Sequence, residues 1–236
     1  MIALIPARAG STRIPNKNIK PLAGHPLVAY TIAAAKESTC FSNIWVCTDS
    51  HDVAAIGLDM GVTVKHRTTS PPTETDYQWI SRLPLPHHDD FCILRPTSPF
   101  RGAETIQRAV KVWTKESDRW DSLRTIRPVS EHPGKMWVTR HDGTVPLMGI
   151  GHGQQPQPWH SMPTQDLPQV YVQTAGLEIA HVSMMIETHS IAGSRIRGLC
   201  LNHWEGFDIN SPDDWVVAEH HATDWPLPAL TDHTKG

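Results

Sequence analysis

Short apolar segments alternate with helix-patterned segments through the first half of this chain. The apolar runs predict buried strands at residues 1–6, 43–48, 62–66, 91–96 and 122–129. Helices are expected between them, at residues 26–38, 50–60 and 104–115. Strands that alternate with helices are typical of an α/β fold with a doubly wound, mostly parallel sheet, whose ligands bind beyond the carboxyl ends of the strands. We therefore expect the functional residues directly after the strands.

The size and composition fit one domain. The 236 residues, of which 39% are hydrophobic, can bury a core, so we expect a single domain over residues 1–236. No apolar run of about 18 residues and no signal-peptide pattern occur, which favours a cytoplasmic protein without a membrane partner. The scattered cysteines are expected to be reduced thiols, the histidines lack zinc spacing, and no G-x-S-x-G hydrolase motif occurs. Nucleic acid is not expected as a partner.

A strongly basic loop follows the first predicted strand. Its four cations are Arg8, Arg13, Lys17 and Lys20. No acidic residue occurs before Glu37, although the whole chain carries a formal charge of -3. A glycine in the loop permits close approach of a ligand to the backbone, and short polar side chains offer hydrogen bonds. The loop is predicted to bind phosphate, the alternative being a solvated basic surface. It matches neither the Walker A loop nor the G-x-G-x-x-G dinucleotide loop.

The composition changes between residues 136 and 169, where prolines accumulate and acids are few. This predicts a long irregular arm. The arm contains large apolar residues whose exposure to solvent would be unfavourable, namely Met136, Trp137, Val138, Leu147, Met148 and Trp159. The alternative is a disordered linker, but these side chains favour an arm that packs on a second subunit of a homodimer.

Strand and helix patterns return after the arm. Strands are expected at residues 171–180 and 196–201, and helices at residues 182–188 and 212–220. The tail beyond residue 222 is expected to be frayed.

The basic loop, which reads ARAGSTRIPNKN at residues 7–18, resembles a known signature. The cytidylyltransferases that activate acidic sugars, the family of CMP-sialic acid synthetase and the Kdo cytidylyltransferases, carry A-R-x-G-S-K-x-[IL]-P-x-K-N there. Thr12 stands where the sialic acid enzymes have lysine, and Arg13 follows it, as in the S-T-R spelling of the Kdo branch. The resemblance implies a Rossmann-like nucleotidylyltransferase fold.

The same resemblance implies where the nucleotide binds. Arg8, Arg13 and Lys17 would hold the triphosphate of CTP, while Asn18 and Arg67 would contact the nucleoside, with Arg67 reaching the cytosine. The full predicted nucleotide-binding set is Ala7, Arg8, Gly10, Ser11, Arg13, Lys17, Asn18 and Arg67.

Three further segments resemble sugar-binding elements of the family. RPTSPFR at residues 95–101 resembles Q-P-T-S-P-L-R, EHPGK at 131–135 resembles an element with a sugar-facing lysine, and LPQVYVQTAGLEIA at 167–180 resembles L-P-Q-x-[FY]-x-x-N-G-A-I-Y. An ammonium is a sensible partner for a sugar carboxylate. The alternatives are a helix-start turn capped by Ser98 and a lysine without a role in the site. The predicted sugar-binding residues are Arg95, Thr97, Ser98, Arg101, Lys135, Gln173 and Thr174.

A candidate metal site lies in EGFDINSPDDW at residues 205–215. It resembles the family's S-I-D-I-D-T-x-x-D, in which two carboxylates on one side of a strand hold magnesium. Asp208 is retained and Asn210 takes the second position, so the resemblance implies an Mg²⁺ cofactor bound by these two residues. The alternative makes both of them turn formers ahead of a helix capped by Ser211, with Asp214 at its third position.

The function implied by the resemblance is transfer of CMP from CTP to the anomeric hydroxyl of a 2-keto-3-deoxy sugar acid, with release of pyrophosphate. A nonulosonic acid of sialic, legionaminic or pseudaminic type is preferred, and Arg8, Lys17 and Asp208 are the expected catalytic residues. The partners are then CTP and an acidic sugar. The alternatives are a Kdo or sugar-phosphate nucleotidylyltransferase and a non-catalytic nucleotide-binding relative. Asn210 and the altered pair Thr174 and Ala175 favour the non-catalytic relative.

Overall fold

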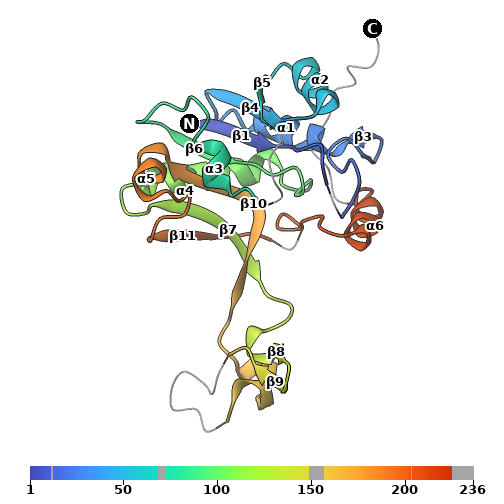
Figure 1. Cartoon of the computed structure of the whole chain (residues 1–236), viewed down its shortest axis with the longest axis vertical. Coiled ribbons are helices and arrows are strands. Elements are labelled where there is room, and N and C mark those ends of the chain that lie inside the picture. The colour runs from blue at the N-terminus through green and yellow to red at the C-terminus, as the bar shows by residue number, and fades with distance from the viewer. Residues whose placement is uncertain (12, 69–72, 149–156, 203, 225–236) are drawn as a thin grey trace.

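The computed structural model describes residues 1–11, 13–68, 73–148, 157–202 and 204–224. Within these residues seven strands form one sheet, in the order β11-β7-β10-β6-β1-β4-β5 (Figure 1). Their bounds are β1 Ile2–Pro6, β4 Asn43–Thr48, β5 Thr63–His66, β6 Asp90–Ile93, β7 Ser122–Pro128, β10 Tyr171–His181 and β11 Ile196–Cys200. Thr12 and the predicted frayed tail from residue 225 onward lie outside the described residues.

The sheet is mostly parallel, as predicted. β1 runs parallel to β4 and β6, β4 runs parallel to β5, and β7 runs parallel to β11. β10 differs, because it lies between β6 and β7 and pairs antiparallel with both. Alternate residues of β1 face opposite sides of the sheet, so that Ile2 and Leu4 enter one core and Ala3 and Ile5 another. All four are buried, which explains the unbroken apolar run.

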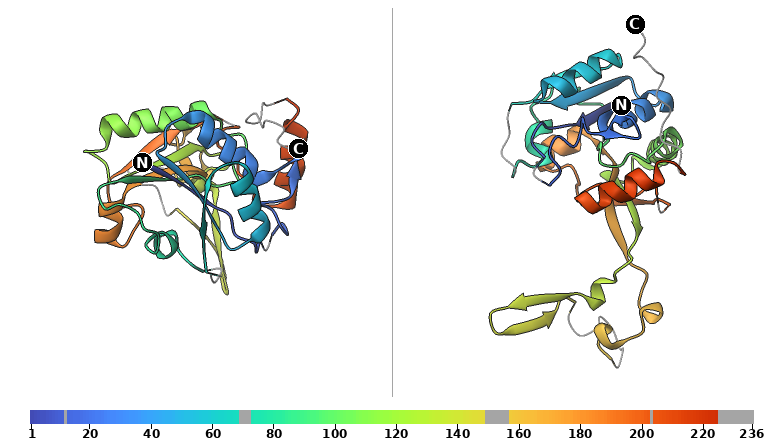
Figure 2. Two further views of the ribbon diagram at one scale, coloured as in Figure 1. Left: turned by 90° about the horizontal axis from the view of Figure 1, so that it is seen from above. Right: turned by 90° about the vertical axis from the view of Figure 1, so that its right-hand side faces the viewer.

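Helices cover both faces of the sheet (Figure 2). They are α1 Leu27–Ser38, α2 His51–Asp59, α3 Asp76–Ile80, α4 Ala103–Glu116, α5 Val182–Thr188 and α6 Pro212–His221. α1 and α4 bury Ile32 and Trp113 in the core around Ile5, and α2 joins the same core. α3 and α5 lie on the other face, where Trp79 packs in the core around Leu4. None of the described helices is long and apolar enough to cross a lipid bilayer.

Most predicted elements are confirmed within one or two residues. The strand at 43–48 and the helix at 182–188 have the predicted bounds, and Ser50 caps α2 by accepting from Val53 N at 3.3 Å. The short helix α3 and the paired β2 (Pro21–Leu22) and β3 (His25–Pro26) were not predicted. Pro26 precedes α1 rather than starting it, because it is the N-cap residue and belongs to β3.

The arm is partly regular, which corrects the expectation of an irregular segment. β7 and β10 continue past the sheet as a two-stranded stalk, in which Tyr171 lies opposite Pro128 (Figure 1). At the far end, β8 (Trp137–Arg140) and β9 (Gly143–Pro146) form an antiparallel hairpin that projects sideways (Figure 2). The short helices η1 Pro133–Lys135, η2 Trp159–Ser161 and η3 Thr164–Asp166 complete the arm.

The root of the arm is held by His132, and the arm exposes apolar side chains. His132 Nδ1 accepts from Gly134 N at 3.0 Å, and His132 Nε2 donates to Pro168 O at 2.9 Å, which ties the two sides of the arm together. Within the single chain, Trp137 is 52% exposed, and Val138 and Leu147 are exposed as well. The apolar residues that the composition singled out are therefore largely uncovered by their own chain.

Candidate active site

The carboxyl ends of β1, β4, β5 and β6 lie along one edge of the sheet, because these strands are parallel. The basic loop follows β1, Arg67 follows β5, and Arg95 follows β6. β10 runs in the opposite direction, so its amino-terminal half, which contains Gln173 and Thr174, reaches the same edge. The structure thus gathers most of the predicted site residues at this edge, whereas Lys135 lies on the arm, at the end of η1.

Hydrogen bonds fix the path of the basic loop. Ala9 N donates to Asp49 Oδ1 at 2.8 Å, which anchors the loop to the end of β4. Asn18 Nδ2 donates to Arg8 O at 3.0 Å, which closes the loop on itself. Asp49 was not predicted to belong to the site, although its position directly after a strand marks it. The predicted contact of Asn18 with the nucleoside stays a prediction, since its amide nitrogen is used within the loop.

The loop offers open backbone and an available cation. Ala7 is buried, and its carbonyl oxygen accepts from Thr48 Oγ1 at 2.6 Å. Gly10 and its neighbour Ser11 are solvent-accessible, and a Cβ atom added at Gly10 would meet nothing within 4 Å, so a ligand can approach the backbone there. Among the residues that the structure describes, none binds the Arg8 guanidinium.

Three loops meet where the basic loop contacts residues 209 and 210. Lys17 Nζ donates to Ile209 O at 2.8 Å, and Arg13 Nη2 donates to Asn210 Oδ1 at 3.0 Å. Ile209 N donates to Thr97 O at 2.8 Å, which joins the loop after β6. Burial lowers the pKa of Lys17, while the nearby charge of Asp208 raises it. The predicted phosphate and metal residues are therefore adjacent although they lie far apart in sequence.

Asp208 and Asn210 interact directly. Asn210 Nδ2 donates to Asp208 Oδ2 at 2.5 Å, although these residues lie in no strand, which corrects the expected local geometry. The predicted cap is confirmed: Ser211 and Asp214 form a capping box at the start of α6, which also begins with Pro212. Asn210 N donates to Asp214 Oδ2 at 2.9 Å as well. The turn before α6 is therefore rigidly held at its backbone.

The oxygen atoms that could bind a magnesium ion at this junction fit such an ion only in part. Asp208 Oδ1 is buried and has no hydrogen-bond partner among the described residues, so it can serve as a ligand. Asn210 Oδ1 already accepts from Arg13, and the described part of the chain contains no group of three or more His, Cys, Asp or Glu side chains that could hold a metal. Mg²⁺ commonly combines one or two carboxylates with waters and phosphate oxygens. These residues therefore fit an ion that binds together with a triphosphate.

Arg101 and Ser98 lie inside the protein rather than at its surface. Arg101 is 1% exposed, and its guanidinium donates to Gly176 O and, at 3.0 Å, to Thr31 Oγ1. Burial lowers the pKa of Arg101 to about 10. Ser98 is fully buried, and its hydroxyl has no partner among the described residues. Arg101 thus supports β10 from within, and its predicted contact with the sugar stays a prediction.

Arg95 belongs to a charge network that the sequence did not reveal. Arg95 Nη2 donates to Asp76 Oδ2 at 2.7 Å and to Glu178 Oε1 at 2.6 Å, and Glu178 also accepts from Arg124. Burial alone would raise the pKa of Asp76, but hydrogen bonding and charge from Arg95 bring the pKa below its usual value. Glu178 is buried in the middle of β10. An acidic residue inside the apolar run GLEIA was the available signal for this network.

Arg67 lies between an acid and an aromatic ring. Arg67 Nη2 donates to Glu74 Oε2 at 2.5 Å, and its guanidinium carbon lies 4.5 Å from the centre of the Trp79 ring. Such stacking orients a guanidinium. The arrangement presents Arg67 at the end of β5, as predicted, while its contact with cytosine remains to be tested.

The remaining predicted sugar residues lie on the arm and along β10. Lys135 Nζ donates to His160 O at 3.1 Å and to Met162 O, both on the arm. Gln173 is exposed on the stalk opposite Ile126. Beyond Gln173, β10 bulges, and the buried Thr174 donates from Oγ1 to Thr125 Oγ1 at 2.7 Å.

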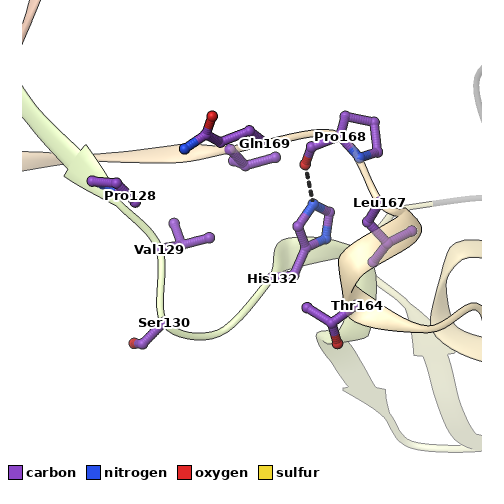
Figure 3. A pocket seen from close by; sticks show the side chains of 9 residues that line it. Pro128, Val129, Ser130, His132, Thr164, Leu167, Pro168 and Gln169 are labelled. Atoms are coloured by element: carbon purple, nitrogen blue, oxygen red, sulfur yellow. Dashed lines mark hydrogen bonds between the residues drawn. The ribbon is translucent and has the colours of Figure 1, made fainter.

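A pocket of about 250 Å³ lies at the root of the arm (Figure 3), and no residue of the basic loop lines it. Its walls come from the two sides of the arm, and include Val129 and His132 on one side and Leu167 and Gln169 on the other. The hydrogen bond from His132 to Pro168 closes one side of it (Figure 3). None of the residues predicted to bind nucleotide, sugar or metal lines this pocket.

The chain is similar in sequence to several known proteins. A family model described as "Cytidylyltransferase" matches residues 2–132. The chain is 32% identical over 230 residues to the CMP-N,N'-diacetyllegionaminic acid synthase of Legionella pneumophila, covering 93% of this chain and 94% of the relative. It is 28% identical over 227 residues to the N-acylneuraminate cytidylyltransferase of Streptococcus agalactiae. That match covers 93% of this chain and 52% of the streptococcal protein, so the chain spans about half the length of that relative.

Two solved structures share the fold. A CMP:2-keto-3-deoxy-manno-octonic acid synthetase complexed with CTP superposes with a TM-score of 0.68 at 13% identity, covering 94% of this chain and 98% of the other. A 4-diphosphocytidyl-2C-methyl-D-erythritol synthase from Anaerococcus prevotii superposes with a TM-score of 0.64 at 11% identity, with the same coverage. At these identities the likeness concerns the fold alone.

Proposed function

The chain belongs to the cytidylyltransferase family, and from this premise we propose that it transfers CMP from CTP to the anomeric hydroxyl of a nonulosonic acid. The observation that carries the proposal is the junction at which Arg13 and Lys17 contact residues 209 and 210, beside the free carboxylate oxygen of Asp208. The 32% identity to a legionaminic acid enzyme over nearly its whole length favours this class of sugar.

The proposed reaction needs position and charge more than a nucleophilic side chain. The anomeric hydroxyl oxygen attacks the α-phosphorus of CTP and loses its proton to solvent, while the bond from this phosphorus to the oxygen that bridges to the β-phosphate breaks and pyrophosphate leaves with that oxygen. Arg8, Arg13 and Lys17 hold the triphosphate and neutralise the charge that develops on it. The exposed backbone at Gly10 lets the phosphates approach the loop closely.

Asp208 is the residue that would hold the magnesium ion, through the oxygen that has no protein partner. When bound, the ion would neutralise charge on the phosphates and orient them for the transfer. Asn210 would be the weaker ligand, because its amide oxygen is uncharged and already accepts from the positively charged guanidinium of Arg13.

The nucleoside would lie toward Asn18 and Arg67, and the sugar toward Arg95 and Thr97, since these residues flank the basic loop along the sheet edge. Lys135 lies on the arm instead. We propose that the arm packs on a second copy of the chain, because Trp137, Val138 and Leu147 are apolar and exposed. In that homodimer, Lys135 would face the sugar carboxylate in the partner's site. CTP as substrate favours the cytoplasm as the location.

One assay tests this function. Pyrophosphate release is measured with each of the four nucleoside triphosphates, crossed with sialic, legionaminic and pseudaminic acids, Kdo and sugar phosphates, with magnesium present or chelated. We expect release only with CTP, a nonulosonic acid and magnesium. Preference for Kdo or a sugar phosphate would replace the proposed substrate class, and absence of release under all conditions would point to a non-catalytic nucleotide-binding protein.

A further inference from the structure

The side-chain amide of Asn210 joins a cation to an anion. Asn210 Oδ1 accepts from Arg13 Nη2 at 3.0 Å, and Asn210 Nδ2 donates to Asp208 Oδ2 at 2.5 Å. A guanidinium only donates and a carboxylate only accepts, so a single orientation of the amide satisfies both neighbours. An aspartate at this position could accept from Arg13 but could not donate to Asp208. Only the amide can therefore bridge these two groups.

We propose that Asn210 is a positioning residue that assembles the phosphate site before any metal binds, and that metal then enters with the nucleotide. The inference rests on the proposed function, because it assigns Arg13 to the triphosphate and Asp208 to the metal. A carboxylate at position 210 would place two anionic side chains in contact, and such a pair needs a cation between them. The amide supplies a donor in that position, so Asp208 stays oriented without an ion.

The balance of charge around the junction supports this assignment. Arg13 and Lys17 are the cations, and Asp208 and Asp214 are the acids that interact with them electrostatically. Among these four groups, two positive and two negative charges balance while residue 210 is neutral. An additional carboxylate would leave one uncompensated negative charge beside a partly buried cluster, and binding of a divalent ion would relieve it.

The amide is held firmly enough to orient its partners. Asn210 N donates to Asp214 Oδ2 at 2.9 Å, which fixes the backbone of Asn210 to the start of α6. The preceding residue is fixed on both sides, because Ile209 O accepts from Lys17 Nζ at 2.8 Å and Ile209 N donates to Thr97 O at 2.8 Å. With its backbone fixed, the Asn210 side chain sets the position of Arg13, which is solvent-exposed.

The test measures equilibrium binding of CTP by calorimetry, in EDTA and in magnesium, for the wild type, Asn210→Asp and Asn210→Ala. We expect wild-type affinity to fall no more than about tenfold on chelation, because the site is already assembled. For Asn210→Asp we expect a fall of about 100-fold or more in EDTA that magnesium restores, because the added charge repels the triphosphate and the bridge is lost. For Asn210→Ala we expect a loss of about tenfold that is equal with and without metal.

A second readout follows metal on the free enzyme. Binding of Mn²⁺ without nucleotide, measured by electron paramagnetic resonance, is expected for Asn210→Asp and is expected to be much weaker for the wild type. Asn43→Asp is the charge control, because Asn43 is exposed at the opposite end of β4, and it should behave as the wild type in both measurements.

The outcomes separate the inference from the function on which it rests. If the wild type does not bind CTP even with magnesium, the proposed function fails. If the wild type binds CTP but Asn210→Asp shows the same metal dependence, or Asn210→Ala binds CTP as tightly as the wild type, the bridging role of Asn210 is wrong while the function stands. Should Asn210→Asp not fold, Asn210→Ala alone decides.

Discussion

The ammonium group of Lys17 donates a hydrogen bond to the backbone carbonyl oxygen of Ile209 at 2.8 Å, across 192 residues of sequence. Lys17 is only 9% exposed, and burial lowers its pKa although the charge of Asp208 opposes that effect. A charge held in a partly desolvated position acts on a neighbouring phosphate more strongly than one in water. This contact therefore places the basic loop and the candidate metal residue in one electrostatic unit.

Arg8 is the cation most available to a ligand. Replacement by alanine should weaken CTP binding about tenfold or more, because a charge-assisted contact is lost, and should lower turnover. Thermal melting should stay nearly unchanged, since no described residue binds this guanidinium. Arg119→Ala, which removes the same charge from an exposed position that follows α4 and lies outside the arm, is the matched control. Unchanged kinetics for Arg8→Ala would remove this residue from the site.

Asp208 should matter for turnover more than for nucleotide binding. Asp208→Asn should reduce the rate at saturating CTP by about 100-fold or more, because the residue proposed to hold the magnesium ion loses its negative charge. Much of the CTP affinity should persist through Arg8, Arg13 and Lys17. Initial rates against magnesium concentration, together with CTP binding, distinguish these effects. A variant with wild-type rate and metal dependence would make Asp208 a turn residue.

The arm should control assembly. Trp137→Lys should convert a dimer to a monomer in light scattering and reduce turnover, because it places a charge in the proposed interface. Leu58→Lys is the matched control, since Leu58 is 64% exposed on α2 and lies outside the arm. The control should remain dimeric and active. A wild type that is already monomeric at assay concentrations contradicts the dimer.

Glu205 should make stability depend on pH. Its carboxylate accepts from Thr105 Oγ1 at 2.5 Å and from Arg108 Nη2 at 3.0 Å. Burial alone would raise the pKa of Glu205, but the hydrogen bonds from Arg108 and Thr105 bring this pKa below the usual value of 4.5. A carboxylate with a lowered pKa stabilises the fold above pH 4.5 and loses this contribution as the pH falls further.

Glu205→Gln tests this directly. The free energy of unfolding of this variant should be lower than that of the wild type by about 1–3 kcal/mol at pH 7, and the difference should become smaller below pH 4.5. Denaturant unfolding at several pH values across this range measures the difference. A difference that is constant from pH 7 to pH 3 would show that the charge of Glu205 is not involved.

Glu178 should be the most costly acid to remove. Glu178→Ala leaves Arg124 and part of Arg95 without a buried partner, so we expect a loss of about 3–5 kcal/mol in urea unfolding. Glu187→Ala is the control, because Glu187 is exposed on α5, and it should change stability by less than about 0.5 kcal/mol. A loss below about 1 kcal/mol for Glu178→Ala would mean that water replaces the acid at both arginines.

The elements of the fold were predictable where a single local pattern determined them. The apolar runs of β1 and β4 and the helical spacing of α4 gave their positions within one or two residues. The direction of β10 was not predictable, because alternation of side chains is the same in parallel and antiparallel pairs. α3 is too short for periodicity, although the cap formed by Thr75 and Gln78 was visible in principle.

The site was predictable as a set of charges but not as a set of contacts. The basic loop was evident because four cations occur before the first acid. Arg101 was expected to contact the sugar, and the structure shows that its guanidinium is buried and donates to Gly176 O. A local sequence pattern could not predict this partner, because it lies 75 residues away. Arg13 and Asn210 likewise meet only because α6 returns its first turn to the loop after β1.

The strand order has a consequence for synthesis of the chain. β10 is translated near the end but lies between β6 and β7, both of which are complete by residue 128. Until residue 181 leaves the ribosome, these two strands present unpaired edges that carry Phe91 and Leu123, side chains fully buried in the finished fold. Unpaired apolar edges recruit other chains. Because the arm lies between β7 and β10 in the sequence, its translation lengthens the interval during which these edges stay unpaired.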